Sequence, residues 1–431
     1  MFERYQGGEQ AILVHVDFQE SDKADNQAQV AEFVELVTSA GIKVDELLTT
    51  RRNAPHKKFF VGTGIADQLK ELVSAHQAEV LLFNHNLSPA QERNIEALCK
   101  CRVVDRIGLI LDIFAQRAST YEGKLQVELA QLKHLSTRLI RGWTHLERQK
   151  GGIGLRGPGE TQLETDRRLL RGRIDSIEGR LKKVSKQREQ GRRARKRTEL
   201  ATVSVVGYTN AGKSTLFNTL TNADVYAQDQ LFATLDPTLR RLEVAPAQDI
   251  ILADTVGFIR DLPHDLVAAF RATLEETQQA DLLLIIVDVA DPQWQQKLSA
   301  VQQVLAEIGA DKVPAIIVKN KMDLLENSDL SVTVGENDLV ESVPISANTG
   351  QGLDELKQAI AQHLRKERIT GKLTLPPEAA RVRGLLFDLK AILSEKYLEE
   401  GHIELEIDVP LSDWRRLQQK VAMDLDNYLS E

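Results

Sequence analysis

Cysteine is scarce in this chain. Only Cys99 and Cys101 occur among its 431 residues. A single Cys-x-Cys pair supplies too few ligands for a structural zinc site. We therefore expect two reduced thiols and no metal centre built on cysteine.

Long apolar runs are missing as well. No stretch reaches the roughly 20 apolar residues that a membrane-spanning helix needs. The first residues, Met1–Tyr5, also lack the basic and apolar regions of a signal peptide. We expect a cytoplasmic protein without stable membrane insertion, and its length allows about two to four domains.

Charge is unevenly distributed along the chain. The net charge is −8, yet residues 166–197 hold fourteen Lys and Arg against four acids, a local +10. The rest of the chain therefore carries about −18. A basic segment set apart in this way suggests a polyanionic partner, and the alternative is a solvated helix surface.

A glycine-rich loop lies near the middle of the chain, at Gly207–Thr215 (GYTNAGKST). It follows the β-branched run Thr202–Val206, which predicts a buried strand, and it opens a helical pattern at Leu216. This strand–loop–helix context is that of a P-loop. Its backbone N–H groups would surround the β-phosphate, with Lys213 at the β/γ-phosphates and Ser214 on Mg²⁺.

A second strand ends in an acid. Ile250–Asp254 is followed by Thr-Val-Gly, so Asp254 is predicted to hold Mg²⁺ through water and Gly257 to meet the γ-phosphate. Position 258, where many GTPases have a glutamine that orients the attacking water, is Phe258. Turnover by the free protein should therefore be slow.

Two later stretches predict the base. Val313–Asp323 is a strand that ends in Asn320-Lys321-x-Asp323, and an Asp323 carboxylate accepts both N1–H and N2–H₂ of guanine, which adenine lacks. Val343–Ala347 places a backbone N–H near guanine O6. The complete predicted set for GTP or GDP is Gly207, Tyr208, Thr209, Asn210, Ala211, Gly212, Lys213, Ser214, Thr215, Asp254, Gly257, Asn320, Lys321, Asp323, Ser346 and Ala347.

The first 118 residues alternate strand and helix patterns. Strands are expected at 11–18, 43–50, 59–61, 80–83 and 103–105, with helices at 28–37, 65–75 and after Ser88-Pro89. Gly62-x-Gly64 fits a tight turn better than a dinucleotide motif, because the third glycine is missing. These elements predict a small α/β domain with a mainly parallel sheet.

Two apolar stripes at helical spacing follow, from Leu125 to Leu146 and from Leu163 to Val184. The glycine-rich run Gly151–Gly159 separates them, so we expect an antiparallel helical hairpin with a glycine tip. The basic stretch Gly191–Arg197 then leads into the GTPase domain and is expected to double as a linker.

The C-terminal part is predicted to contain a helix at 378–397, an alternating strand at Ile403–Val409 and a final helix near Ser412. The fold class is therefore α/β, with a P-loop GTPase domain at 199–369. A small α/β domain at 1–118 and the helical hairpin at 119–198 precede it, and a small α+β domain at 370–431 follows.

Two stretches carry a family resemblance, Gly151–Arg168 (GGIGLRGPGETQLETDRR) and Phe232–Thr238 (FATLDPT). With them the chain resembles HflX, of the Obg–HflX GTPases, over its whole length, including Val61–Gly64 and Ser88–Asn94. The resemblance implies a GTPase that binds the 50S ribosomal subunit and splits stalled 70S ribosomes under stress, with a secondary ATPase activity in its N-terminal region. Ile65 departs from the family, which commonly has lysine there, so a contact of that lysine with ATP or RNA is in doubt.

The resemblance also assigns roles. Thr234 becomes the switch threonine, which gives Ser214, Thr234 and Asp254 as Mg²⁺ ligands and Lys213, Thr234, Gly257 and Asn210 as catalytic residues. Asn210 resembles the P-loop asparagine of GTPases that recruit K⁺, and a turn residue with favourable backbone geometry is the alternative. Contacts with ribosomal RNA are expected from Gly151, Gly152, Gly154, Arg156, Gly157, Gly159, Arg192, Arg193 and Arg195.

Other functions remain open from the residues alone. A P-loop enzyme that phosphorylates a small molecule is disfavoured by the guanine signature. A regulatory scaffold bound to RNA or to an acidic membrane surface would also suit the basic hairpin, although its basic end lacks interleaved aromatics. A monomeric, ribosome-stimulated GTPase is the leading hypothesis.

Overall fold

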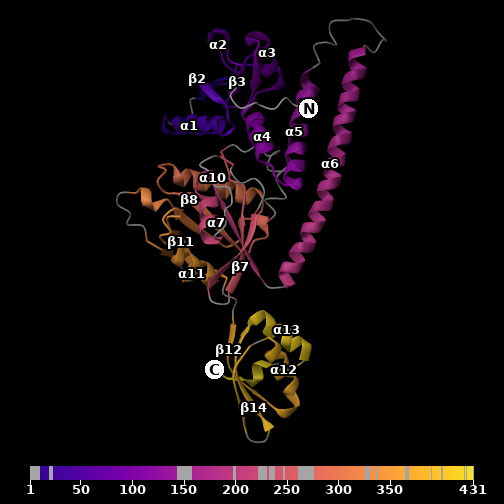
Figure 1. Cartoon of the computed structure of the whole chain (residues 1–431), viewed down its shortest axis with the longest axis vertical. Helices are drawn as coiled ribbons and strands as arrows, with labels where there is room; N and C mark the ends of the chain where they lie inside the picture. Colours follow the sequence, from indigo (N-terminus) through magenta and orange to yellow (C-terminus); the bar gives the residue numbers. More distant parts are fainter. Residues whose placement is uncertain are drawn as a thin grey trace. The chain divides into compact units, whose positions relative to one another are not determined.

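The computed structural model describes residues 10–18, 23–142, 158–197, 200–221, 231–232, 238–245, 248–260, 276–325, 331–335, 338–364, 368–389, 391–398, 401–421, 423 and 425–430. It divides into two compact units, Met1–Ile360 and Ala361–Glu431. The elements of each unit are labelled in Figure 1.

The chain begins with a four-stranded parallel sheet in the order β2-β1-β3-β4. Apolar residues face both sides of the central strand β1, and helices supply both covering layers. This confirms the predicted parallel α/β arrangement. The elements are β1 (Gln10–Phe18), α1 (Lys23–Ser39), β2 (Lys43–Arg52), α2 (Thr63–His76), β3 (Val80–Phe83), α3 (Pro89–Cys99), β4 (Arg102–Val104) and α4 (Arg106–Arg117).

Local chemistry explains where α3 begins. Ser88 accepts from the Gln91 N–H while the Gln91 side chain accepts from the Ser88 N–H, and Pro89 occupies the first turn. This reciprocal capping satisfies two backbone donors that a helix start leaves unpaired. The predicted start at Ser88-Pro89 is confirmed.

The strand predicted at Phe59–Val61 is wrong. His56 and Phe60 exchange backbone hydrogen bonds of 2.7 and 2.9 Å, and Phe60 has a φ of 65°. The chain therefore closes a tight turn here, and the apolar side chains fill the core beneath the sheet. An apolar triplet is too short for its composition to distinguish these two outcomes.

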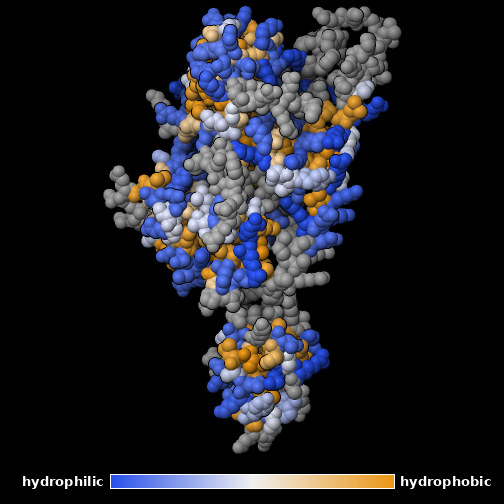
Figure 2. Space-filling view, viewed as in Figure 1, coloured by the Kyte–Doolittle hydropathy of each residue, from blue (hydrophilic) through white to orange (hydrophobic). Residues whose placement is uncertain are grey.

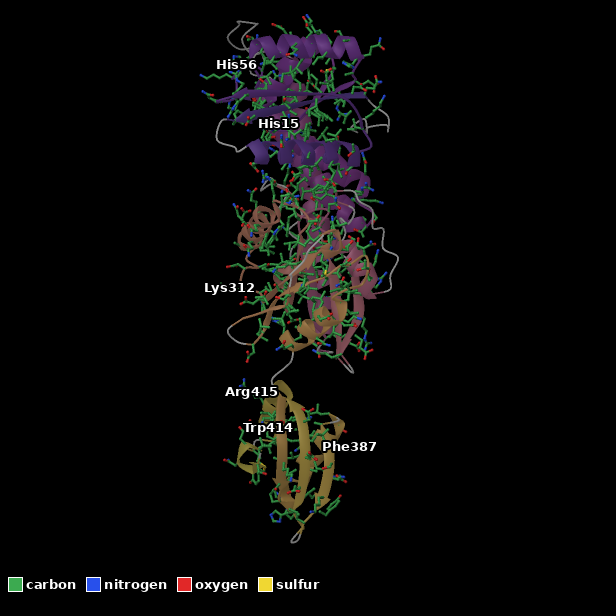
Figure 3. The ribbon with its side chains drawn as sticks, turned by 90° about the vertical axis from the view of Figure 1, so that its left-hand side faces the viewer. His15, His56, Lys312, Phe387, Trp414 and Arg415 are labelled. Carbon is green, nitrogen blue, oxygen red and sulfur yellow. The ribbon has the colours of Figure 1, made fainter. Side chains whose placement is uncertain are left out.

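His85 packs beside the core of this sheet. Its ring stacks on His15 at 5.2 Å between centroids, and its Nε2 accepts the Val16 N–H at 3.0 Å. Burial lowers the pKa of His85 to about 4, so it acts as a neutral acceptor. His15 is labelled in Figure 3.

Helices α5 (Tyr121–Gly142) and α6 (Pro158–Arg197) form the predicted antiparallel hairpin and lie side by side (Figure 1). Leu125, Leu129 and Ile177 make its buried seam. Glu122 near the start of α5 pairs with Arg188 near the end of α6, while Lys133 further along α5 pairs with Glu178 earlier in α6. This reversed order shows that the two helices are antiparallel.

Two details of the hairpin differ from the sequence prediction. Helix α6 starts at Pro158, so Gly159 belongs to its first turn, where proline is tolerated because it has no N–H to lose. The basic stretch to Arg197 is helical and is not a linker, since arginine is a good helix former and favours the helix C-terminus. The predicted tip residues 151–157 lie outside the described residues, as do Trp143 and Leu146.

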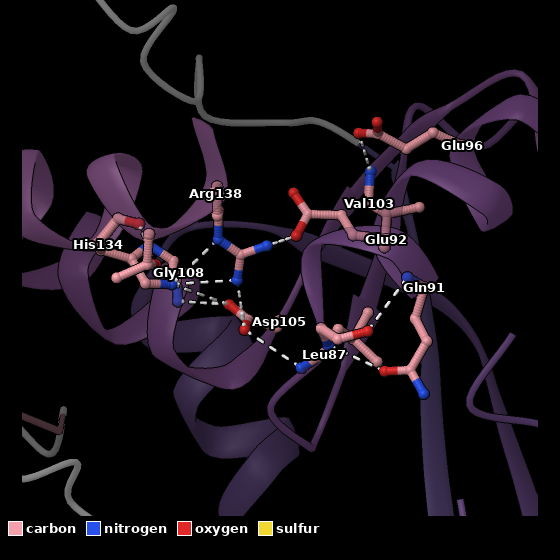
Figure 4. A network of polar contacts seen from close by, with 11 residues as sticks. Leu87, Gln91, Glu92, Glu96, Val103, Asp105, Gly108, His134 and Arg138 are labelled. Atoms are coloured by element: carbon pink, nitrogen blue, oxygen red, sulfur yellow. Dashed lines mark hydrogen bonds and ion pairs between the residues drawn. The ribbon is translucent and has the colours of Figure 1, made fainter. Parts of the chain in front are cut away.

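A partly buried ion-pair network joins the hairpin to the first sheet (Figure 4). Arg138 of α5 donates to Asp105 Oδ2 at 2.6 Å and also pairs with Glu92 of α3. Asp105 in turn caps α4 by accepting the Gly108 N–H at 2.9 Å. The end of α5 that leads into the glycine run is thus fixed to the N-terminal sheet through a carboxylate that is itself held by backbone.

A seven-stranded sheet follows in the order β10-β11-β9-β8-β5-β7-β6, parallel except at its two edges. The most apolar strand, β8, lies at its centre, as the sequence predicted. The elements are β5 (Ala201–Gly207), α7 (Lys213–Thr221), β6 (Thr238–Ala245), β7 (Gln248–Asp254), β8 (Leu282–Asp288), α10 (Trp294–Glu307), β9 (Ala315–Asn320), η1 (Met322–Leu324), β10 (Thr333–Val334), β11 (Val340–Pro344) and α11 (Leu353–His363).

The second unit is an antiparallel sheet in the order β13-β14-β12-β15, with helices packed on it. Trp414, labelled in Figure 3, is buried and donates its Nε1–H to Asp426 Oδ1 at 2.7 Å. The elements are β12 (Arg368–Leu375), η2 (Pro377–Ala379), α12 (Ala380–Asp388), β13 (Ile392–Tyr397), β14 (Ile403–Pro410), α13 (Leu411–Val421), η4 (Leu425–Tyr428) and β15 (Leu429–Ser430).

The single helix predicted at 378–397 is wrong. Helix α12 ends at Asp388, and Ile392–Tyr397 forms the edge strand β13. Pairing with β14 decides this segment, because its own residues have no strong preference and tertiary pairing overrides propensity. The alternating strand was predicted well, since Leu405, Ile407 and Val409 face the core. The domain boundary predicted at residue 370 falls inside β12.

Candidate nucleotide-binding site

The predicted nucleotide residues converge on one edge of the seven-stranded sheet. They follow the carboxyl ends of the parallel strands β5, β7, β9 and β11. Ligands bind open α/β sheets at this edge, because loops from neighbouring strands meet there. Four segments distant in sequence thus come together.

The loop Gly207–Ser214 connects β5 to the start of α7. Gly212 has a φ of 89°, and a Cβ there would lie 2.2 Å from the Asn320 amide nitrogen. Gly207 packs on β8, where a Cβ would lie 2.4 Å from the Ile286 oxygen. Both glycines are therefore required by close approach of neighbouring groups.

Lys213 lies buried beneath this loop. Its Nζ donates to the Tyr208 oxygen at 2.7 Å, so the side chain runs back across the loop. Burial lowers the pKa of Lys213 to about 8, and the nearby Asp254 opposes that shift. A cation held in this way is desolvated before any phosphate arrives.

Two oxygen-bearing side chains stand together beside Lys213. The Ser214 hydroxyl donates to Asp254 Oδ2 at 2.9 Å, and Asp254 is fully buried at the end of β7. A hydroxyl and a carboxylate are hard oxygen donors of the kind that Mg²⁺ prefers, so the residues present fit the ion. A Cβ at Gly257 would lie 2.9 Å from Lys213 Nζ, which places that glycine at the same point.

Asn320 connects the P-loop to the loop after β11. Its Nδ2 donates to the Ala211 oxygen at 2.8 Å, and its Oδ1 accepts the Ala347 N–H at 2.9 Å. The backbone N–H predicted near guanine O6 therefore has an acceptor within the protein. Ser346 is fully buried beside it.

The other residues of the base signature are more open. Lys321 has a φ of 66°, and its Nζ lies 2.7 Å from Asp288 Oδ2 at the end of β8. Asp323 is exposed in the short helix η1. These positions leave the Asp323 carboxylate accessible to a base.

Phe258 is buried, and both of its backbone groups bond to the P-loop. Its N–H donates to the Gly207 oxygen at 3.0 Å, and its C=O accepts the Thr209 N–H at 2.7 Å. The side chain carries no polar atom that could orient water. Slow turnover by the free protein stays a prediction.

The N-terminal sheet contributes side chains that the sequence did not reveal. From α1, Glu32 accepts from the Tyr208 hydroxyl, Glu35 from the Asn210 amide at 3.1 Å, and Asp25 from Arg260 at 2.5 Å. Positions 25, 32 and 35 share one face of α1. That spacing was visible in the sequence, but no pattern indicated what this face would contact.

The Tyr208 hydroxyl holds a central position in these contacts. It donates to Glu32, which also binds Arg106 of α4, and it accepts the Arg260 N–H at 2.7 Å. Burial and the adjacent Glu32 raise the pKa of Tyr208 far above its usual range, so the hydroxyl stays protonated. The P-loop, the segment after Gly257 and α1 are thereby linked.

A cavity of about 340 Å³ lies between α1 and the P-loop. Its charged lining includes Glu32, Glu35, Asp288, Asp291 and Lys297. Lys297 bonds to Asp291 and lies 5.0 Å from the centre of the Tyr208 ring. The nucleotide edge of the sheet therefore borders a polar cavity shared with the first sheet.

Some predicted residues cannot be placed. Thr234 and Gly151, Gly152, Gly154, Arg156 and Gly157 lie outside the described residues. Gly159, Arg192, Arg193 and Arg195 are placed only as backbone of α6. The visible face of α6 is mainly hydrophilic (Figure 2).

The fold and the site together define a P-loop GTPase. Family models agree in three successive segments. "GTP-binding GTPase N-terminal" matches residues 27–115, "GTP-binding GTPase Middle Region" residues 117–195, and "50S ribosome-binding GTPase" residues 202–321. The chain belongs to the HflX family of GTPases.

Full-length relatives support this membership. GTPase HflX of Escherichia coli K12 is 58% identical over 97% of this chain and 97% of its own length. GTPase HflX of Caldanaerobacter subterraneus is 43% identical over 95% and 93%. Among solved structures, a GTP-binding protein from Sulfolobus solfataricus in complex with GDP is 24% identical, with a TM-score of 0.44, over 83% of this chain and 99% of that one.

Family membership establishes a GTP-binding GTPase. Among the helices that the structure describes, none is both long and apolar enough to cross a membrane.

Proposed function

We propose that this GTPase binds the large (50S) ribosomal subunit and splits stalled 70S ribosomes in the cytoplasm, with the helical hairpin as its ribosome-binding arm. The observation that carries the proposal is helix α6. It is 40 residues long and so spans about 60 Å at 1.5 Å per residue. Such a rod reaches RNA sites that are closed to a globular face.

The charge of this helix supports the same partner. Residues 166–197 carry +10, and the exposed arginines of α6 include Arg168, Arg171 and Arg180. Phosphate contacts of arginine give affinity without base selection, and they make binding strongly dependent on salt. The family description "50S ribosome-binding GTPase" over residues 202–321 supports the 50S subunit as the target.

For hydrolysis, we propose that Lys213 contacts the β/γ-phosphates and that Asp323 accepts from guanine. Ser214, Asp254 and the switch threonine Thr234 would hold Mg²⁺, which neutralises phosphate charge when bound. Gly257 would donate its N–H to the γ-phosphate. Phe258 offers no polar atom to orient the attacking water. We therefore propose that the bound ribosome brings about this orientation and so stimulates GTP hydrolysis.

We also propose a monovalent cation beside the phosphates, with the Asn210 side chain as a ligand. The αL backbone of Asn210, with a φ of 60°, equally suits a plain turn residue. Hydrolysis should be faster in K⁺ than in Na⁺ if the cation binds. Equal rates of hydrolysis in the two salts would show that the proposed cation site is wrong, without affecting the GTPase assignment.

Sedimentation tests the ribosome proposal. The full chain is mixed with 50S subunits, with 70S ribosomes or with anionic liposomes, with and without a non-hydrolysable GTP analogue. Binding to 50S and loss of the 70S peak in the presence of the analogue are expected. Binding to liposomes alone would favour the alternative, a membrane-associated regulatory scaffold.

Replacing Arg192, Arg193 and Arg195 together by alanine tests the arm. The log–log salt slope of 50S binding should flatten by about two, at roughly 0.7–0.9 per lost phosphate contact. Shortening the glycine run Gly151–Gly157 should leave binding largely intact and abolish splitting. If the shortened variant splits 70S ribosomes at the normal rate, the glycine run is only a turn and has no role in splitting.

Three further expectations accompany the proposal. The protein acts as a monomer, so its sedimentation coefficient should not depend on concentration. The N-terminal region is expected to hydrolyse ATP as a second nucleotide. Measurement of ATP hydrolysis by the Asp323→Asn variant tests this. The four-domain division is to be tested by limited proteolysis.

A further inference from the structure

Asn210, like Tyr208, is a P-loop residue whose side chain contacts α1 beside the first sheet. Its Nδ2 donates to Glu35 Oε1 of α1 at 3.1 Å. An ionised carboxylate offers only acceptors, so the nitrogen of the amide must face it. The Oδ1 of the planar amide is therefore turned away from α1.

Glu35 is placed to hold this orientation. It is half-buried on α1, and within the described part of the chain its hydrogen bond is to Asn210. The neighbouring carboxylate Glu32 is occupied differently, by Arg106 and the Tyr208 hydroxyl. Of the two, Glu35 has no cationic group hydrogen-bonded to it among the described residues, although Lys297 and Lys321 act on its charge from a greater distance.

Charged groups of both signs surround Glu35. The groups that face it are Glu32 on its own helix, Lys297 of α10, Lys321 after β9 and the Asn210 amide. Lys297 bonds to Asp291 and Lys321 to Asp288. Both lysines therefore direct their hydrogen bonds to other carboxylates that border the same cavity.

We propose that Glu35 is a positioning residue for GTP hydrolysis: it fixes the Asn210 amide with Oδ1 free to ligate a monovalent cation, and its charge attracts that cation. The inference rests on the cation proposed at Asn210. It adds a residue from outside the GTPase domain to the nucleotide site. Glu35 touches no substrate and acts through Asn210.

A charge a few ångströms behind the ligand has a measurable effect on the cation. Lys297 and Lys321 offset part of the Glu35 charge and solvent screens the rest, so removing this carboxylate should raise the K⁺ concentration for half-maximal stimulation about fivefold. Loss of the amide orientation adds about another factor of two, because the two amide orientations become equally populated. The combined expectation for Glu35→Ala is about tenfold.

The experiment measures GTP hydrolysis by the full chain while K⁺ replaces Na⁺ at constant ionic strength. Glu35→Ala should need about ten times more K⁺, and Glu35→Gln should need less than Glu35→Ala, because it keeps a carbonyl acceptor for Nδ2. Glu71→Gln, which removes an exposed carboxylate of α2, is the charge control and should match the wild type. The KM for GTP should change less than the K⁺ requirement.

Asn210→Gly tests the cation site independently of the role proposed for Glu35. Glycine keeps the αL backbone and removes only the side chain, so it should abolish the difference between K⁺ and Na⁺. If Asn210→Gly abolishes that difference while Glu35→Ala and Glu35→Gln titrate like the wild type, the role of Glu35 is wrong and the cation site stands. If the wild type shows no difference between the salts, the cation site and the role of Glu35 fail together.

Discussion

Asn320 at the end of β9 donates its Nδ2–H to the Ala211 oxygen of the P-loop at 2.8 Å. Its Oδ1 accepts a second hydrogen bond from the loop after β11. One buried side chain therefore holds together two segments that are predicted to bind opposite ends of the nucleotide. This geometry gives a first prediction.

Asn320→Ala should weaken both the site and the fold. It leaves the Ala211 oxygen and the Ala347 N–H unpaired in a buried setting, at about 1–3 kcal/mol each. GDP affinity should fall at least about tenfold, as measured by calorimetry, and the thermal unfolding midpoint of the nucleotide-free protein should also fall. Asn320→Asp keeps the acceptor for the Ala347 N–H but places a carboxylate against the Ala211 oxygen, so it tests the Ala211 contact and should also weaken GDP binding. If Asn320→Ala binds GDP with the affinity of the wild type, the two hydrogen bonds of Asn320 do not contribute to nucleotide binding.

Asp323→Asn should exchange base specificity. The exposed carboxylate offers two acceptors to guanine N1–H and N2–H₂, and an amide places a donor against one of them. GTP binding should fall about tenfold or more, while xanthosine triphosphate should bind better than GTP. A fluorescent-nucleotide competition assay measures both, and unchanged GTP affinity would mean that the base site lies elsewhere.

The buried Lys213 should make the free energy of unfolding increase as the pH rises. Its pKa in the folded protein is about 8, below the ordinary 10.5. Between these values the unfolded chain binds the proton and the folded protein does not, so the free energy of unfolding rises with pH across this window. The slope from this residue is about 1.4 kcal/mol per pH unit at most.

Urea denaturation of the nucleotide-free protein between pH 7.5 and pH 10 measures this effect. Tyrosine, cysteine and other lysine side chains titrate in the same range, so the wild type is compared with Lys213→Met. The difference between the two should grow with pH. A difference that is constant across the range would show that Lys213 remains charged when buried.

Ile177→Ala should loosen the hairpin. The side chain is fully buried between the two helices, and removing it costs about 2–4 kcal/mol by loss of burial and creation of a cavity. Leu169→Ala, also on α6 but 63% exposed, is the control and should have little effect. Hydrogen exchange of the α6 amides should accelerate only in the first variant. Equal protection in both would mean that the seam does not hold the hairpin.

The sequence by itself determined the parallel sheets, the P-loop and the order of the nucleotide segments. Buried parallel strands need continuous apolar runs such as Leu282–Asp288, and these are local patterns. The P-loop was equally visible, because its glycines and Lys213 must stand at fixed spacing around a phosphate. The hairpin followed from two apolar stripes interrupted by glycine.

Only the tertiary structure decided where non-local contacts form. Phe59–Val61 became a turn and Ile392–Tyr397 an edge strand because each depended on what packed against it. The contact of Glu35 with Asn210 joins residues 175 positions apart in the chain, and no local pattern encodes which surface a polar helix face will meet. Secondary structure and phosphate chemistry are short-range and appear in sequence, whereas the choice of partner for a side chain is made only when the chain folds.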